Sequence, residues 1–556
     1  MSGFNLASSI RTWAKNSPWL VIAVMIHLVL FAALSVVYVT QHFEKKEDKP
    51  VAVAISKPQV NQEEIQPPPP EVIDRKAVPK NSDAEIVSYE EEVFTPLTTQ
   101  SQDEDLHLDR GDPTAVDNLP PGATGGTSIG TGGVGHYGTG VPSGFATRRA
   151  GGGGKKGRAG GTTEGTEAAV LEGMRWLIRH QNEDGSWGAD TLLEHCSTKA
   201  QCISDNQDFS PQYNPGLTGL ALLAFLGAGY QHDSKQKIVD TAMGKRYVVG
   251  DVVGKGIKWL ISEQGPDGSF SNYAGSMYNE AIGALALTEA YGLSQNPALK
   301  EPAEKLINYL VSAQKSNPTS TGRWGWRYTP GGDSVADTSV TGWVVMAFKS
   351  AQIAGLKVPQ QSFEGAMDFA TWVTGEQGLV GYLDPAGAGQ AVTGHNDRFD
   401  YHVATMSSLG MIVRTFIKHD ISDPFLDLAA GQIIKDLPKV SEDHLSVDYY
   451  YWYYGTLALN QFDGPASPKQ NGKYWKAWDR ALGDVLLPLQ DETKTCARGG
   501  WQTPDRWSLV GGPIYRTAIN VLTLEVYYRY ENAFAAASLT KRDVKDAPKK
   551  DEIEKK

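Results

Sequence analysis

Carboxylic acids stand at the start of two apolar segments in the C-terminal part of the chain. Asp333 and Asp337 precede the segment that begins at Val340, and Glu280 directly precedes the segment 281–287. A buried carboxylic acid that stays neutral can donate a proton in general acid catalysis. The same position suits a structural role, because the first N–H groups of a helix need an acceptor and an Asp oxygen supplies one. We favour the cap for Asp337 and keep all three residues as candidate catalytic acids.

Other polar and aromatic side chains stand at equivalent helix starts along the chain. They are Asn279, Thr338, His402, Tyr451, Trp452 and Arg516. If these helices surround a common centre, their first turns converge on one mouth of a central cavity. A mouth lined in this way suits a small apolar molecule or a sugar. Helix capping alone would also place polar residues at these positions.

Neither a metal nor a cofactor is expected from the histidines and cysteines. Residues 394–402 hold two histidines and two aspartates, but their spacing matches no standard metal site, and we interpret the stretch as a loop-to-helix junction. Three cysteines in the chain rule out a disulfide scaffold and a four-cysteine zinc site. Cys196 and Cys202 are close enough in sequence to form a local disulfide outside the cytoplasm, without Cys496.

The elements that carry these residues repeat six times between about residues 166 and 530. Each unit reads as an amphipathic helix, a loop and a more apolar helix. The first helices are expected to start near Ala169, Val252, Pro302, Phe363, Leu426 and Tyr474. The second helices are expected to include 217–225, 281–287, 341–348, 401–406, 455–459 and 518–524. Helices with so little polar surface are typical of an interior, so we expect an all-α fold, an (α/α)6 double-ring toroid with the apolar helices inside.

The loops between the paired helices share a glutamine that is followed by glycine and an aromatic residue. Their characteristic residues are Gln181, Trp187, Gln264, Phe270, Trp324 and Trp501. The glutamine can bond helix-end groups, and the aromatic side chain can pack under the next outer helix. These loops resemble the QW repeats of the squalene–hopene cyclase and terpenoid cyclase–prenyltransferase superfamily. The resemblance covers the chain from about residue 166 to 530, although the fifth unit lacks the loop signature, and it implies a closed toroid whose loops hold the repeats together.

The same resemblance implies a catalytic segment, Asp-x-Asp-Asp-Thr-Ala, in which the middle Asp protonates the substrate. The matching segment here is 334–339, where Ala336 replaces the acid while Asp337 and Thr338 match. We therefore predict a binding or scaffold module. The alternatives are a terpene cyclase, an isomerase or mutase, with an altered acid, and a glycan-active enzyme on the same toroid.

The N-terminal part of the chain predicts a membrane anchor. Residues 16–43 contain no Asp, Glu, Lys or Arg, and the apolar stretch 18–40 is long enough to cross a lipid bilayer as one helix. It is also longer than the apolar core of a cleaved signal peptide. The order of helix, acidic proline-containing tether and outer domain resembles that of energy-coupling proteins of the TonB type, and His27 matches their transmembrane histidine. This resemblance implies a membrane motor or an envelope protein as partner.

The chain therefore divides into four predicted segments. They are an N-terminal arm with one transmembrane helix (1–43), a disordered linker that is acidic and proline-containing and then glycine-rich (44–165), the toroid (166–532) and a charged disordered tail (533–556). The short arm and the large C-terminal domain favour a single-pass protein of a bacterial inner membrane, with a cytoplasmic N-terminus and a periplasmic toroid. A net charge of -12 argues against nucleic-acid binding.

Overall fold

The computed structural model describes residues 164–196, 202, 209–240, 242–273, 276–330, 335–393, 396–470 and 472–534. In this part of the chain, apolar helices alternate with amphipathic ones. The apolar helices are α4 (Asn214–Gly227), α6 (Met277–Ser294), α8 (Thr338–Ile353), α10 (Ala404–Lys418), α12 (Tyr449–Asp463) and α14 (Gly512–Arg529). The amphipathic helices are α3 (Glu164–Arg179), α5 (Val249–Ser262), α7 (Pro297–Ser312), α9 (Gln360–Trp372), α11 (Pro424–Ile433) and α13 (Lys473–Leu486).

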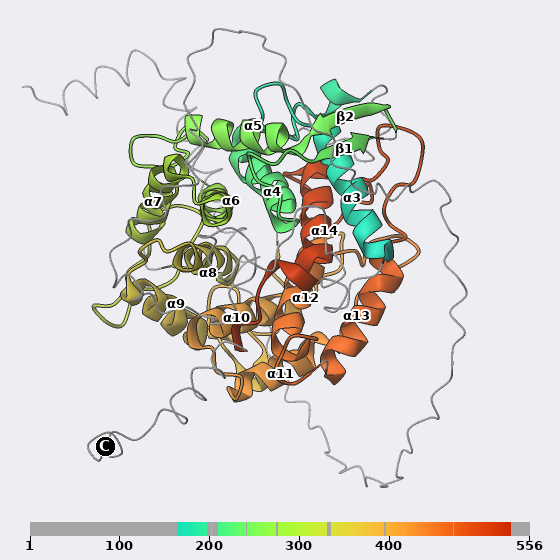
Figure 1. Ribbon diagram of the computed structural model, residues 1–556. Helices are drawn as coiled ribbons and strands as arrows, with labels where there is room; N and C mark the ends of the chain where they lie inside the picture. The colour runs from blue at the N-terminus through green and yellow to red at the C-terminus, as the bar shows by residue number, and fades with distance from the viewer. Residues whose placement is uncertain are drawn as a thin grey trace, which may run out of the picture. The chain divides into compact units, whose positions relative to one another are not determined.

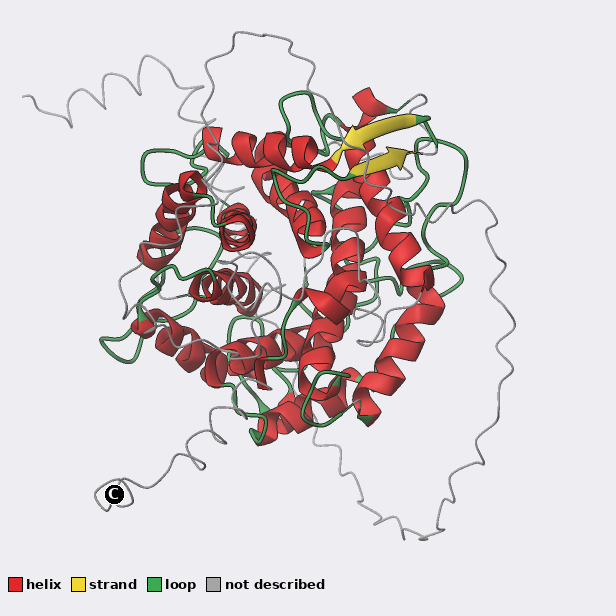
Figure 2. Ribbon diagram, in the orientation of Figure 1, coloured by secondary structure: helices red, strands yellow, loops and turns green. Residues whose placement is uncertain are grey.

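The six apolar helices form a closed inner ring. Each packs on the next in the order α4, α6, α8, α10, α12 and α14, and α14 packs back on α4. The other six surround this ring: α3 packs on α14, α5 on α4, α7 on α6, α9 and α11 on α10, and α13 on α12. Figures 1 and 2 show the two layers of helices. The expected double ring of helices is therefore present in the described residues.

Burial explains which helices lie inside. Every residue of α4 and of α12 is buried, so neither helix has a face for solvent. Outer helices such as α7 bury only one side, including Leu299, Leu306 and Leu310. A helix that is apolar on all sides must pack against neighbours on every side, whereas a helix with one apolar stripe needs neighbours on that side only.

Glutamines of four loops make the same pair of hydrogen bonds. Each side-chain amide donates to a carbonyl of its own loop and to a carbonyl in the first turns of the next outer helix. The pairs between helices are Gln181 with Val252 (2.9 Å), Gln264 with Pro302 (3.1 Å), Gln314 with Ser362 (2.9 Å) and Gln490 with Ala169 (2.8 Å). The last pair joins the sixth unit to the first, so it closes the ring.

Aromatic residues of the same loops are held to the helices before and after them. Each aromatic residue donates its backbone N–H to a side chain on the following inner helix. The pairs are Trp187 with Thr218, Phe270 with Glu280, Trp326 with Thr341 and Trp501 with Thr517. The three indole N–H groups donate to Leu177, Leu310 and Leu486 at the end of the preceding outer helix, at 2.7–2.9 Å. The loop tryptophans therefore join the outer and inner helices of the first, third and sixth units, and Phe270 bonds the inner helix of the second.

In the third unit this position belongs to Trp326, where we expected Trp324. The carbonyl of Trp324 accepts the bond from Gln314, which is the place that Gly185 takes in the first loop. Its ring packs against Phe369 of α9, with the ring centroids 5.5 Å apart. Two tryptophans two residues apart fit the sequence pattern equally well, and the hydrogen bonds distinguish them.

The described residues also contain a short sheet, so the all-α expectation is incomplete. Strands β1 (Lys237–Asp240) and β2 (Lys245–Val248) pair in antiparallel register between α4 and α5. Asp240 accepts hydrogen bonds from the N–H groups of Ala242 and Met243, which shapes the turn between the strands. Strands of four residues are too short to show a clear alternation in sequence.

The predicted transmembrane helix at residues 18–40 lies outside the described residues. Among the helices described here, none combines the length and the hydropathy that a membrane span requires. Most of the predicted linker and most of the predicted tail also lie outside the described ranges, and the last two residues assigned to the linker, 164 and 165, begin α3.

Candidate functional site

Asp337 lies directly before α8 and caps it. One carboxylate oxygen, Oδ1, accepts the N–H of Val340 at 2.8 Å. The side chain is fully buried, and burial raises the pKa of this carboxyl to about 7. The second oxygen, Oδ2, is buried and makes no hydrogen bond to the described residues. Asp337 is therefore both a helix cap and a carboxyl group with one oxygen still available.

Tyrosines from three parts of the ring gather around this helix start. The Tyr278 hydroxyl on α6 donates to Ser339 Oγ at 2.8 Å, and Ser339 also bonds the Tyr450 hydroxyl on α12. The hydroxyls of Tyr328 and Tyr382 bond each other. Tyr278, Tyr328 and Tyr382 are partly exposed. Hydroxyl groups therefore link α6, α8 and α12 at one end of the inner ring.

Glu280 and Asn279 stand in the first turn of α6, and both serve packing contacts. Both carboxylate oxygens of Glu280 accept the N–H of Phe270, at 3.0 and 3.1 Å. Burial raises the pKa of Glu280 to about 8. Asn279 donates to the carbonyl of Gln212 and accepts the N–H of Gly216, so it fastens the start of α4 to α6. Glu280 thus occupies the position that threonine takes in three of the other units.

Thr338 and His402 also bond neighbouring loops. The Thr338 hydroxyl donates to the carbonyl of Gly381 at 2.7 Å. His402 lies before α10, where its Nδ1 is 2.6 Å from a carboxylate oxygen of Asp436 and its Nε2 is 3.2 Å from the carbonyl of Ser446. Burial opposes the charge of His402, but the hydrogen bond to Asp436 and the charge of Asp448 raise its pKa overall.

The remaining three expected cavity residues are fully buried. The Tyr451 hydroxyl donates to the carbonyls of Ile433 and Asp436, both at 3.0 Å. Trp452 packs edge-on against Tyr449, with the ring centroids 5.5 Å apart. Arg516 donates through Nε to the carbonyl of Trp501 at 3.2 Å. These contacts place the three side chains among structural partners inside the ring.

Two further carboxyl groups lie near the same end of the ring. Asp448 caps α12 by accepting the N–H of Tyr451, and it also accepts the indole N–H of Trp507. Asp505 accepts the N–H of Tyr449 at 3.0 Å from a different loop. Burial raises the pKa of both, that of Asp505 to about 7. An Asp before an aromatic helix start is a capping signal that would have indicated Asp448, whereas no local pattern indicates Asp505. The candidate acid Asp333 lies outside the described residues.

Side chains from non-adjacent inner helices meet across the interior of the ring. Trp343 on α8 stacks on Tyr453 of α12, with centroids 6.1 Å apart. Arg529 on α14 forms an ion pair with Glu289 on α6 at 2.7 Å and donates to the carbonyl of Leu223 on α4 at 2.7 Å. Both members of the ion pair are fully buried. These contacts join α8 to α12 and α14 to α4 and α6 through the interior of the ring.

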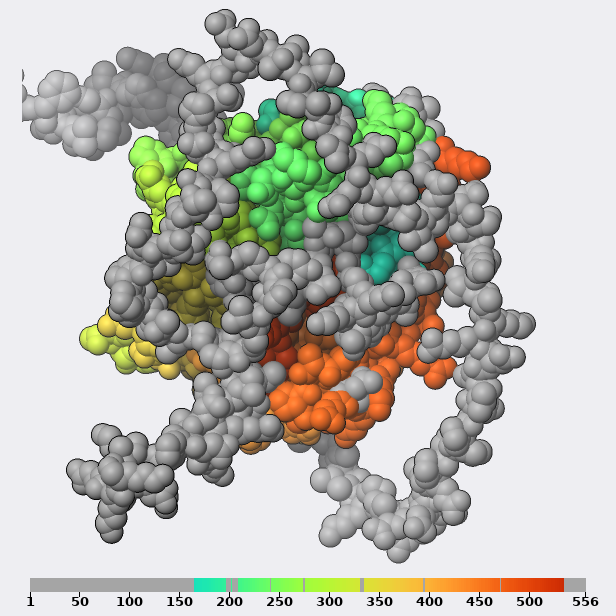
Figure 3. All heavy atoms as spheres, in the orientation of Figure 1, coloured from blue at the N-terminus to red at the C-terminus, as the bar shows by residue number. Residues whose placement is uncertain are grey.

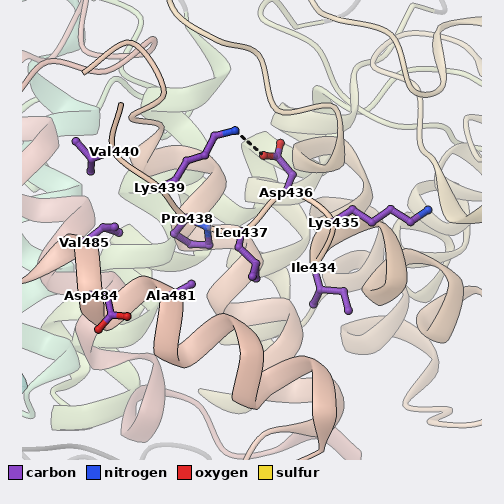
Figure 4. A pocket seen from close by; sticks show the side chains of 10 residues that line it. All are labelled: Ile434, Lys435, Asp436, Leu437, Pro438, Lys439, Val440, Ala481, Asp484 and Val485. Atoms are coloured by element: carbon purple, nitrogen blue, oxygen red, sulfur yellow. Dashed lines mark ion pairs between the residues drawn. The ribbon is translucent and has the colours of Figure 1, made fainter. Parts of the chain in front are cut away.

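A surface groove opens on the outer layer of the double ring, between the fifth and sixth outer helices. It lies between the segment 434–440, which follows α11, and α13, with Ala481, Asp484 and Val485 on the helix side, and it has a volume of about 460 Å³. Figure 4 shows the lining side chains, and Figure 3 shows residues of the α13 region, in orange, at the surface. Asp436 and Lys439 form an ion pair at 4.0 Å in this groove. Asp436 also bonds the buried His402, so one residue of the groove contacts the segment that leads into α10.

Comparisons with known proteins give distant similarities. No protein-family model and no curated protein matches the chain. Among solved structures, the chain is similar to the type II terpene cyclase MstE from Scytonema, at 14% identity and a TM-score of 0.38, over 65% of this chain and 98% of that one. It is also similar to the GH76A alpha-1,6-mannanase from Salegentibacter sp., at 12% identity and a TM-score of 0.42, over 66% of this chain and 99% of that one. Function is therefore argued from this chain's own residues.

Proposed function

We propose that the protein is a non-catalytic binding module, anchored in a membrane through residues 18–40 and presenting its helical ring outside the cytoplasm. The observation that supports this best is the pair of contacts across the ring interior, where Arg529 pairs with Glu289 and Trp343 stacks on Tyr453. The expected acid Glu280 adds to it, because both of its oxygens bond one backbone N–H. A scaffold role is compatible with such contacts across the interior, whereas a cyclase needs room there for its substrate.

The surface groove suits a segment of a partner protein. Its floor includes Ile434, Leu437 and Val485, which can bury apolar side chains of the partner. Lys435 and Asp484 are exposed and carry charges of both signs at its edge. A volume of about 460 Å³ matches a few side chains and falls within the usual range for binding pockets. An envelope protein or a membrane motor, the partners expected from the N-terminal resemblance, supplies such a segment.

Site-specific photo-crosslinking in the full-length protein tests this proposal. With a benzophenone amino acid at Asp484, on the groove edge, we expect one dominant adduct with another protein in intact membranes. The matched control places the same amino acid at Lys476, which is exposed on α13 and outside the groove. Equal adducts from both positions, or none from Asp484, would contradict a groove that binds a partner.

A second function, acid catalysis on an isoprenoid or a sugar, rests on Asp337. A general acid must be neutral at working pH, and burial raises the pKa of Asp337 to about 7. Its Oδ2 has no hydrogen-bond partner among the described residues, and partly exposed tyrosines lie beside it. Asp337 occupies the third acidic position of the cyclase motif rather than the middle one, so this candidate ranks second.

The acid role makes a clear prediction for incubation with squalene. If Asp337 is the acid, cyclic products form, and their rate falls about tenfold per pH unit above pH 7 as the carboxyl loses its proton. The variant Asp337→Asn keeps a good helix cap and should abolish the product. Asp448→Asn is the matched control, because it changes the cap of α12 instead. We expect no product from the wild type, and a product lost only in Asp337→Asn would establish the enzyme.

A further inference from the structure

Two cysteines of the chain lie against one histidine, and the third cysteine lies against one of these two. His180 directly follows α3, Cys196 follows the 3-10 helix η4 (Leu192–His195), Cys202 lies in the next loop, and Cys496 lies between α13 and α14. His180 Nε2 lies 3.8 Å from Cys196 Sγ and 3.4 Å from Cys202 Sγ. Cys202 Sγ lies 3.2 Å from Cys496 Sγ, although the two residues are 294 positions apart in the sequence.

The arrangement is not explained by a disulfide or by apolar packing. None of the three cysteines is in a disulfide. A disulfide between any two of them would leave the third thiol and the imidazole facing that disulfide. Packing alone does not require a polar ring nitrogen to face two sulfurs. One ligand atom from each of His180, Cys196 and Cys202 lies within 4.8 Å of the others, as expected for groups that share a central ion.

The orientation of His180 is that of a metal ligand. Its Nδ1 lies 2.7 Å from the carbonyl oxygen of Trp176, and a carbonyl only accepts, so the proton is on Nδ1. The lone pair of Nε2 therefore points to the sulfurs. The ring also stacks on the indole of Trp176, with centroids 4.0 Å apart and an interplanar angle of 24°. Metal-binding histidines commonly donate their other N–H to a backbone carbonyl in this way.

We propose that His180, Cys196, Cys202 and Cys496 bind one structural Zn²⁺ ion. Zn–S bonds of about 2.3 Å and Zn–N bonds of about 2.1 Å give tetrahedral edges of about 3.6–3.8 Å. The separations of 3.8 and 3.4 Å from His180 Nε2 to Cys196 and Cys202 are close to these edges, and the 3.2 Å between Cys202 and Cys496 lengthens when the ion binds. Four protein ligands leave no open position for substrate, which is typical of structural sites. The thiols release their protons to solvent as the Zn–S bonds form. His180 thus supplies the fourth ligand that the cysteine count by itself lacks.

The charge and burial of the surroundings suit such an ion. His180 and Cys202 are almost fully buried, and Cys496 is 6% exposed. Three thiolates and Zn²⁺ carry one net negative charge. The Arg179 guanidinium adjoins the site, since its Nη2 donates to the carbonyl of Cys496 at 3.4 Å. Arg179 also pairs with Asp240 at 2.9 Å, so its positive charge is shared between that carboxylate and the site.

The position of the site indicates what the ion does. His180, Cys196 and Cys202 belong to the first unit, and Cys496 belongs to the sixth, so the ion joins the two ends of the ring. The bond from Gln490 to Ala169 and the ion pair between Arg498 and Glu172, at 3.2 Å, lie along the same seam. Because the unfolded chain has no preformed site, the binding free energy of the metal stabilises the closed ring. This role is independent of what the groove binds.

Metal analysis of the full-length protein tests the proposal. Purified without added metal or chelator, the wild type is expected to carry about one zinc per chain. Replacement by Co²⁺ should produce sulfur-to-cobalt charge-transfer bands and the strong visible bands of tetrahedral cobalt. Removal of the metal with a chelator should lower the Tm by roughly 5 °C or more. The variant Cys496→Ser should lose most of the zinc and this Tm response.

The control variant is His195→Ala. The His195 ring lies 6.1 Å from that of His180, but its Nε2 bonds Asn182, so zinc and the cobalt spectrum should be retained. If Cys496→Ser fails to fold, the cobalt spectrum of the wild type decides the matter by itself. A folded wild type without zinc and without charge-transfer bands would overturn the proposal. Mass spectrometry showing a disulfide between any two of the cysteines would do the same.

Discussion

Replacing Arg529 with methionine is expected to lower the free energy of unfolding by about 3–5 kcal/mol, because it leaves buried carboxylates without their cation. Arg529 pairs with Glu289 at 2.7 Å and with Glu525 at 3.5 Å, and all three side chains are fully buried. The neighbouring carboxylates raise the pKa of Arg529 despite the burial that opposes its charge. Gly227 of α4 has no side chain at this point, where a Cβ would clash with Glu525 and Arg529.

Urea denaturation of the full-length protein measures this loss. Lys305→Met is the matched control, because Lys305 pairs with Glu301 at 2.9 Å on an exposed surface, where such pairs contribute about 0–1 kcal/mol. Adding Glu289→Gln to Arg529→Met should recover part of the stability, since it removes one of the stranded charges. Similar losses in Arg529→Met and Lys305→Met would contradict a larger contribution from the buried ion pairs of Arg529.

Replacing Trp501 with alanine is expected to cost about 3–5 kcal/mol, as for other buried tryptophans. Trp501 is fully buried in the loop between α13 and α14. Its backbone N–H donates to Thr517, and its indole N–H donates to the carbonyl of Leu486 at 2.9 Å. The same loop holds Gln490, which bonds Ala169 of α3. Loss of the indole therefore removes core contacts and loosens the seam where the ring closes.

Hydrogen exchange distinguishes this local effect from a general one. Relative to the wild type, Trp501→Ala should accelerate amide exchange more in α3 and α14 than in α8, which lies away from the seam. Trp372→Ala is the control, because Trp372 is 43% exposed and its removal should cost under about 1 kcal/mol. Uniformly faster exchange in all helices would contradict a special role of this loop in ring closure.

The helices of the ring were predictable because each carries its own signal. An amphipathic helix and an apolar one differ in the polarity of every turn, so their alternation is visible without any tertiary information. The loop glutamines were recognisable because glycine and an aromatic residue follow each of them in the same loop. Their partners on the next outer helix lie between 38 and 321 residues away along the chain, so the sequence does not indicate them. The fully buried helices α4 and α12 agree with this pattern in the structure.

The candidate site was predicted only in part. The cap at Asp337 followed from its position before a helix, and the structure confirms it through the bond to Val340. Its free oxygen and its raised pKa depend on neighbours from α6 and α12, which no local pattern reveals. The choice between Trp324 and Trp326 likewise depends on the partner helix that each one reaches.

Periodic hydropathy along the chain was enough to establish six helix pairs, because burial of an apolar surface acts on each helix through its own residues. Closure of the ring, the contents of its interior and the meeting of His180 with Cys496 depended on the folded chain. These features join residues hundreds of positions apart, and the distance between such residues is set by the summed rotation of all six units. The sequence around any one pair of residues therefore does not reveal how far apart the two lie in the folded chain.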